Sequence, residues 1–132
     1  MNTKQFEFDA VVNHLFAQGR PAMAQDEHGP GCYYRHPYDH NLKCAVGCRI
    51  PDAVYTEEMD KGADGEGTGI YALIRRFGKV LPPEIEAYQG MFAALQSVHD
   101  GETSGGPFDK DRLARHLTNV AHAHGVVFTR PE

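Results

Sequence analysis

The sequence predicts a mainly α fold (α+β), a compact bundle of four to six helices with a small β-hairpin around residues 32–44. Three observations point to this class. Apolar residues recur at three- and four-residue spacing in several segments, and glycine or proline ends most of these segments. The stretch around 32–44 instead has strand-like composition and contains Pro37. The chain has 132 residues, so we expect one globular domain over 1–132.

The first segment is the clearest helix. Its apolar side chains fall on one stripe, which predicts one buried face. Gly19 then supplies a helix end, and Pro21 follows it. The stripe consists of Phe8, Val11, Val12, Leu15 and Phe16.

The middle of the chain predicts short elements. The run Cys32-Tyr33-Tyr34-Arg35 reads as a strand, residues 36–41 as a turn, and Leu42-Lys43-Cys44 as the returning strand of a hairpin. Residues 45–50 predict one or two helical turns that end before proline. A further short helix is expected over 52–60.

Three longer helices are expected after the glycine-rich stretch that follows. The first covers 70–77 with a cap at Thr68, and the second runs from 82 to about 101 on a single apolar stripe. The third begins after Asp109, and its stripe includes Leu117. Residues 126–128 predict a short strand or a packed tail.

Composition excludes some classes of protein and disfavours others. No apolar run approaches the ~20 residues that span a bilayer, so no membrane partner is expected. The net charge of −5 makes nucleic acid an unlikely partner, because nucleic-acid binding needs a basic surface. Three cysteines and an N-terminus without an export signal indicate reduced thiols in the cytoplasm, or in the host cytoplasm if a phage encodes the protein.

Cysteine and histidine recur at every fourth position from His28 to Cys48, which raises the question of zinc. A hairpin that brought Cys32 beside Cys44, with His36 and Cys48, would offer the sulfur and nitrogen ligands that zinc prefers. The usual pair of cysteines two residues apart is absent, and prolines separate the candidates. We therefore predict no metal and no cofactor, with these four residues as the alternative zinc site. Buried structural thiols are the simpler interpretation.

A thiol enzyme is the second alternative. Cys44 at the start of a helical turn would have its thiolate favoured by backbone amides, and His99 with Asp100 could supply a base and its orienting carboxylate. No sequence signature of a cysteine nucleophile accompanies these residues, so we predict no catalytic residues and keep Cys44, His99 and Asp100 as the alternative.

Two motifs carry a resemblance to known proteins. The first joins Cys32-Tyr33-Tyr34-Arg35 to the run from Leu42 to Asp52, and the second is Leu95-Gln96-Ser97-Val98-His99-Asp100. Both resemble a group of small uncharacterised proteins of phages and bacterial prophages, with a Cys-x-Tyr-Arg element followed by Lys-Cys-Ala-Val-Gly-Cys-Leu-Ile-Pro-Asp. The chain departs from that pattern at Arg49, where an apolar residue is usual, and in a longer turn bearing His36 and His40.

The resemblance implies a small accessory phage product that binds a host or defence protein. We predict a non-enzymatic binding module, with Tyr34, Arg35 and Lys43 as the binding residues. The alternatives are the thiol- or metal-dependent enzyme and a zinc-stabilised nucleic-acid adaptor. The oligomeric state stays open. Gly47 disfavours a helix, which predicts close packing there, and Arg35 is expected to be held by a carboxylate or by carbonyls.

Overall fold

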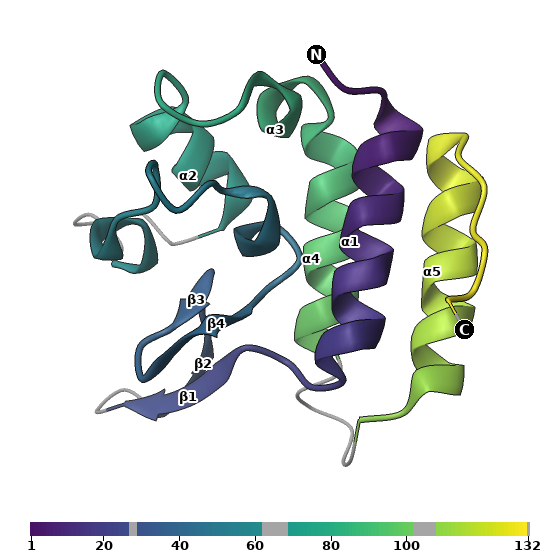
Figure 1. Cartoon of the computed structure of the whole chain (residues 1–132), viewed down its shortest axis with the longest axis horizontal. Helices are drawn as coiled ribbons and strands as arrows, with labels where there is room; N and C mark the ends of the chain where they lie inside the picture. Colours follow the sequence, from purple (N-terminus) through teal and green to yellow (C-terminus); the bar gives the residue numbers. More distant parts are fainter. Residues whose placement is uncertain (27–28, 62–68, 102–107, 132) are drawn as a thin grey trace.

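The computed structural model describes residues 1–26, 29–61, 69–101 and 108–131, and not the side chains of 24–26 and 29–32. It confirms the predicted class, because helices dominate and a small antiparallel hairpin lies within residues 32–44 (Figure 1). The α-helices are α1 (Lys4–Gln18), α2 (Ile70–Phe77), α3 (Pro83–Ala87), α4 (Gln89–Gly101) and α5 (Lys110–His124). The strands are β1 (Met23–Asp26), β2 (Gly29–Cys32), β3 (Arg35–His36) and β4 (Asp39–Lys43), and single 3-10 turns form η1 (Gly47–Arg49) and η2 (Glu57–Asp60).

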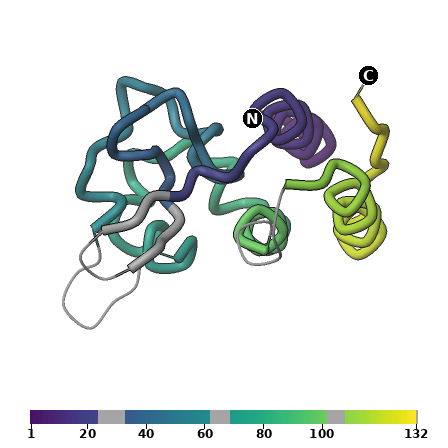
Figure 2. Tube along the Cα trace, turned by 90° about the horizontal axis from the view of Figure 1, so that it is seen from below, coloured from purple at the N-terminus to yellow at the C-terminus, as the bar shows by residue number. Residues whose placement is uncertain are grey.

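The three long helices α1, α4 and α5 run side by side, and Figure 2 shows them nearly end-on. The hairpins, the 3-10 turns and α2 lie on the side of α1 and α4 that faces away from α5 (Figures 1 and 2). Leu15, Phe92 and Leu117 come from the three helices and are all buried in one core, as their stripes predict. Within the described residues, no helix has the length and apolar character needed to cross a bilayer.

Local sequence signals explain both ends of α1 and α5. The Thr3 hydroxyl accepts from a backbone N–H of the first turn of α1, and Gly19 ends that helix with φ of 68°. The Asp109 carboxylate caps the start of α5, and Gly125 ends it with φ of 70°. Only glycine adopts this left-handed conformation at little cost, so both predicted helix ends are confirmed.

Two later predictions need correction. The single helix expected from 82 to about 101 is two helices, because Tyr88 leaves the helical conformation between α3 and α4. The Tyr88 hydroxyl donates to the carbonyl of Asn2, whose N–H donates to Glu84, so the start of the chain holds this corner. The N-cap of α2 is Gly69, not Thr68, which lies outside the described residues.

The chain forms two hairpins, one within the predicted region and a further one before it, over residues 23–32. β1 pairs with β2, and β3 pairs with β4 across the turn at Pro37 and Tyr38. Cys32 therefore lies opposite Met23, and the hairpin does not bring Cys32 opposite Cys44 as the zinc interpretation assumed. The difference arises because the chain leaves the first hairpin at Tyr33 before it enters β3.

The helix expected over 52–60 is reduced to η2, and residues 126–128 form a packed tail without a strand. The side chain of Gln5 pairs with the backbone of Val127 through two hydrogen bonds of 2.8 Å. The ring of Phe128 stacks on Phe16 with 6.3 Å between centroids. The tail therefore covers part of α1.

Candidate functional site

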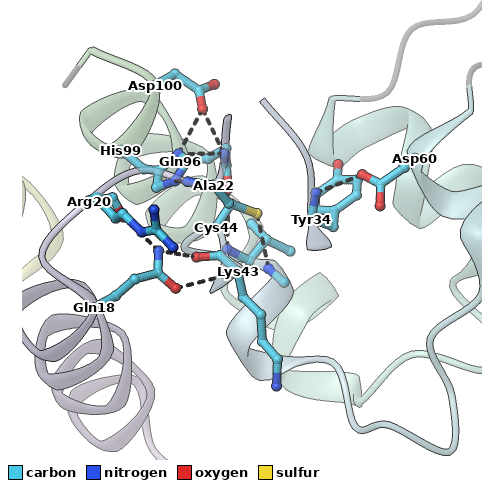
Figure 3. Close-up of polar contacts among 12 residues, drawn as sticks. Gln18, Arg20, Ala22, Tyr34, Lys43, Cys44, Asp60, Gln96, His99 and Asp100 are labelled. Carbon is cyan, nitrogen blue, oxygen red and sulfur yellow. Dashed lines mark hydrogen bonds and ion pairs between the residues drawn. The ribbon is translucent and has the colours of Figure 1, made fainter. Parts of the chain in front are cut away.

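Side chains of α1 and α4 hold the backbone on either side of the hairpins (Figure 3). The Gln18 carboxamide exchanges two hydrogen bonds of 2.8 Å with the backbone of Lys43, and His14 donates to the same carbonyl at 2.8 Å. The Gln96 oxygen accepts from the N–H of Val46 at 3.2 Å. These contacts supply partners for backbone groups at the end of β4 and in the segment that follows it.

His99 is 2% exposed and completes this set. The backbone N–H of Ala22 donates to His99 Nε2 at 2.9 Å, so that nitrogen carries no proton. Nδ1 then carries the proton and donates to Asp100 at 3.0 Å. We call His14, Gln18, Gln96, His99 and Asp100 the backbone clamp.

Cys44, the alternative nucleophile, is 0% exposed. Its sulfur accepts from the N–H of Gly47 at 3.2 Å, and burial raises the pKa of its thiol well above the ordinary value. Burial also raises the pKa of Cys48 to about 12. Both thiols are protonated at neutral pH, and the free nitrogen that a base would need on His99 is occupied by Ala22. The geometry gives the thiol-enzyme hypothesis no support.

Gly47 makes the close contact that the sequence predicts. A Cβ atom at this position would lie 1.9 Å from the carbonyl oxygen of Tyr34. The same carbonyl accepts from the N–H of Cys44 at 3.2 Å. The Cys-x-Tyr-Arg and Lys-Cys-Ala-Val-Gly-Cys elements are therefore packed backbone against backbone.

Arg35 is held as predicted, by a carbonyl and a carboxylate. Its Nη2 lies 2.8 Å from the Ile50 oxygen and 2.8 Å from Asp52 Oδ1. Asp60 holds the neighbouring backbone, accepting from the N–H groups of Tyr34 at 2.6 Å and Arg35 at 3.3 Å. The Tyr55 hydroxyl also donates to Asp60, at 2.5 Å. Burial raises the pKa of this carboxyl group.

The predicted binding residues have unequal access to a partner. Tyr34 is 5% exposed and Arg35 is 6% exposed, so these side chains face the protein interior. Lys43 is half-buried, and its ammonium lies 3.9 Å from Asp52. Tyr34 and Arg35 therefore contact the rest of the chain and are almost closed to solvent.

The candidate metal ligands whose side chains the structure describes do not lie together. Among the described residues, no three of His, Cys, Asp or Glu are placed to hold a metal ion. Cys44 is buried, and His36 Nδ1 accepts from the N–H of Tyr38 at 3.1 Å. The side chains of His28 and Cys32 lie outside the described residues. Absence of zinc stays a prediction, which elemental analysis of the purified protein tests.

The exposed part of this region is the hairpin tip, residues 36–41. Tyr38 is 86% exposed at the turn, and its ring lies edge-on to His36. His40 lies edge-on to the Tyr55 ring at 5.9 Å between centroids. The longer turn bearing His36 and His40 is visible in the sequence, but its composition does not indicate which of its side chains face solvent.

Sequence reasoning also missed an ion pair beside η1. Glu7 of α1 is 2% exposed, and Arg49 donates to both of its carboxylate oxygens, at 3.0 and 2.9 Å. Glu7 fits the helical pattern, so only its position beside the apolar stripe could have indicated a buried ion pair.

Comparison of the chain with protein-family models, with curated proteins and with solved structures finds no match in any of the three. The interpretation of the site therefore depends on its geometry.

Proposed function

We propose that this protein is a non-enzymatic binding module of phage type that acts by binding a host or defence protein in the host cytoplasm. The observation that carries the proposal is the hairpin tip, where Tyr38 is 86% exposed while the candidate catalytic side chains of Cys44 and His99 are bonded to the backbone. Exposed tyrosine on an ordered turn is typical of residues that dominate protein interfaces.

The tip is ordered by its own polar groups, which favours a role in binding. His36 accepts from the N–H of Tyr38, and the Asp39 carboxylate accepts from the N–H of Asn41 at 3.0 Å. Both contacts fix the turn before a partner arrives, so less conformational entropy is lost on association. A preformed turn with an exposed ring therefore suits recognition.

The base of the same hairpin is fixed to the helical core. Leu42 is buried, and Gln18 and His14 bond the backbone of Lys43. These hydrogen bonds from two residues of the backbone clamp therefore hold the base of the hairpin against α1. A rigid scaffold carrying an exposed loop is the usual arrangement for a binding surface.

Capture experiments with matched variants test this proposal. Immobilised protein is incubated with a bacterial lysate, and bound proteins are identified by mass spectrometry. We expect a protein that is retained by the natural chain and lost from Tyr38→Ala. The control is Tyr71→Ala, which removes another exposed tyrosine from α2, 57% exposed and outside the tip.

The proposal fails if no protein is retained specifically, or if Tyr38→Ala retains the same proteins as the natural chain. It also fails if Tyr71→Ala and Tyr38→Ala lose the same protein, because the tip would then have no special role. Circular dichroism of each variant checks that the fold is kept.

A further inference from the structure

A small cavity lies beside the hairpin tip. Its volume is about 150 Å³, which is smaller than the roughly 300–1,000 Å³ of sites for small molecules. A cavity of this size suits a single side chain of a partner. We call it the Tyr55 pocket, and it is lined by Tyr33, Arg35, Pro37, His40, Tyr55, Glu57, Asp60 and Lys61.

The two cations that line the Tyr55 pocket are already matched by carboxylates that do not line it. Arg35 lies 2.8 Å from Asp52, and Lys61 lies 3.6 Å from Glu58. Asp52 also lies 3.9 Å from the Lys43 ammonium, so these pairings reduce the positive charge toward an incoming group without cancelling it.

The two carboxylates that line the pocket, Glu57 and Asp60, are not matched by cations in this way. Glu57 is exposed and carries no ion pair among the residues that the structure describes. Asp60 is bonded to neutral donors, the Tyr55 hydroxyl and two backbone N–H groups. The pocket therefore combines aromatic walls with one carboxylate, Glu57, that has no cationic partner among the described residues, and a second, Asp60, that is bonded to neutral donors.

We infer that the Tyr55 pocket receives one cationic side chain, lysine or arginine, from the bound protein. This inference rests on the proposed binding function and names the chemistry of its partner. The aliphatic stem of such a side chain packs against the aromatic walls, and its charge ends at the rim beside Glu57.

The position of Arg35 determines where the charge of the incoming side chain lies. Its guanidinium lies 4.5 Å from the centre of the Tyr55 ring and covers one face of it. An incoming cation is therefore placed at the rim, away from Arg35 and near Glu57. An anionic side chain would meet Glu57 and Asp60 and is disfavoured by charge.

Blocked tripeptides test the inference on the purified protein. The probes are acetyl-Gly-X-Gly-amide with X as lysine, arginine or norleucine, titrated while the tyrosine ring resonances are followed by NMR. We expect both cationic probes to shift the Tyr33 and Tyr55 resonances and norleucine to bind more weakly. Glu57→Gln should weaken the cationic probes by about two- to five-fold, the range for exposed ion pairs.

The matched control is Glu86→Gln, which removes the same charge from an exposed position of α3. It should leave probe binding unchanged. The inference is overturned if norleucine binds as well as lysine, if no probe shifts the two rings, or if Glu86→Gln weakens binding as much as Glu57→Gln. Capture that still depends on Tyr38 would then leave the proposed function standing. Cationic binding without any Tyr38-dependent capture would overturn the proposed function alone.

Discussion

Two stretches of the chain, residues 43–50 and the hairpin tip at 36–41, lie next to each other in the sequence and differ in which groups bond to their backbone. In 43–50, helix side chains and the packed Tyr34 carbonyl bind the backbone, and Cys44, Ala45 and Val46 are fully buried. In the tip, the N–H groups of Tyr38 and Asn41 bond to side chains two residues away, and residues 37–41 are exposed. Its contacts with the rest of the chain are made by side chains, Asp39 with Arg20 and His40 with Tyr55.

The comparison teaches that chemical residue type is a poor guide to function in this chain. Cysteine, histidine and carboxylate near 43–50 serve the fold, because each one bonds a backbone group. The histidine and tyrosine side chains at the tip make fewer hydrogen bonds to the backbone. Perturbing the first region should therefore cost stability, and perturbing the second should cost binding.

Thiol labelling should show the largest difference. Because Cys44 is fully buried and its thiol pKa is raised, alkylation in the native state should be slower than in the denatured chain by about a thousand-fold or more, if reaction requires unfolding. Peptide mapping by mass spectrometry measures the rate at each cysteine. Fast native labelling with a pH midpoint well below about 8.5 would instead reveal an activated thiolate and revive the enzyme hypothesis.

Gly47→Ala should cost about 3 kcal/mol or more of unfolding free energy, because the new methyl group would lie 1.9 Å from the Tyr34 carbonyl oxygen and the backbones must separate. Denaturant unfolding measures the change. Gly101→Ala is the control, since among the described residues no atom beyond its chain neighbours and its own helix lies within 4 Å of the place its methyl group would take, and alanine suits the end of α4. Equal stability of the two variants would show that the close contact is wrong.

Arg49→Leu should destabilise the fold by about 2 kcal/mol, because it leaves the buried Glu7 carboxylate without its bidentate partner. The double variant with Glu7→Gln should recover part of that loss, which a double-mutant cycle measures. If the two single losses simply add, the pair makes no energetic contribution of its own.

The pH dependence of stability should carry a modest contribution from His14. Burial lowers the pKa of His14 below 6.5, so the unfolded chain binds a proton there before the folded protein does. Stability should therefore fall as the pH drops below about 6.5 toward the lowered folded pKa. Unfolding measured between about pH 5 and pH 7 should show a shallower slope in His14→Gln than in the natural chain. His116→Gln, at an exposed position of α5, should keep the natural slope.

Tyr38→Ala should change the unfolding free energy by less than about 0.5 kcal/mol, the range of exposed sites. Thermal unfolding of the variant measures this. A larger loss would mean that the tip supports the fold, and the contrast between the two stretches would then break down.

The sequence predicted the elements whose signals are local. The apolar stripe and Gly19 located α1, and Asp109 with Gly125 located both ends of α5. The close contact at Gly47 could also be predicted, because a glycine in a helical turn implies a neighbour too close for a side chain. These features depend on residues a few positions apart.

The features that the sequence did not predict depend on distant partners. The break at Tyr88 interrupts no apolar spacing, and it is fixed by a bond to Asn2. The first hairpin contains Gly29-Pro30-Gly31, residues that disfavour strands. The backbone clamp joins α1 and α4 to residues up to 77 positions away, and glutamine or histidine on a helix gives no pattern for such bonds.

The tail that covers α1 has a consequence for the order of folding during synthesis. The two hydrogen bonds between Gln5 and Val127 join residues 122 positions apart. At about 5–20 residues per second, a ribosome needs roughly 6–24 seconds to make the intervening chain. For that time the Phe16 ring lacks the Phe128 ring that later stacks on it. The first helix to be made is therefore among the last to be fully covered, and its apolar edge is open to chaperones in the nascent chain.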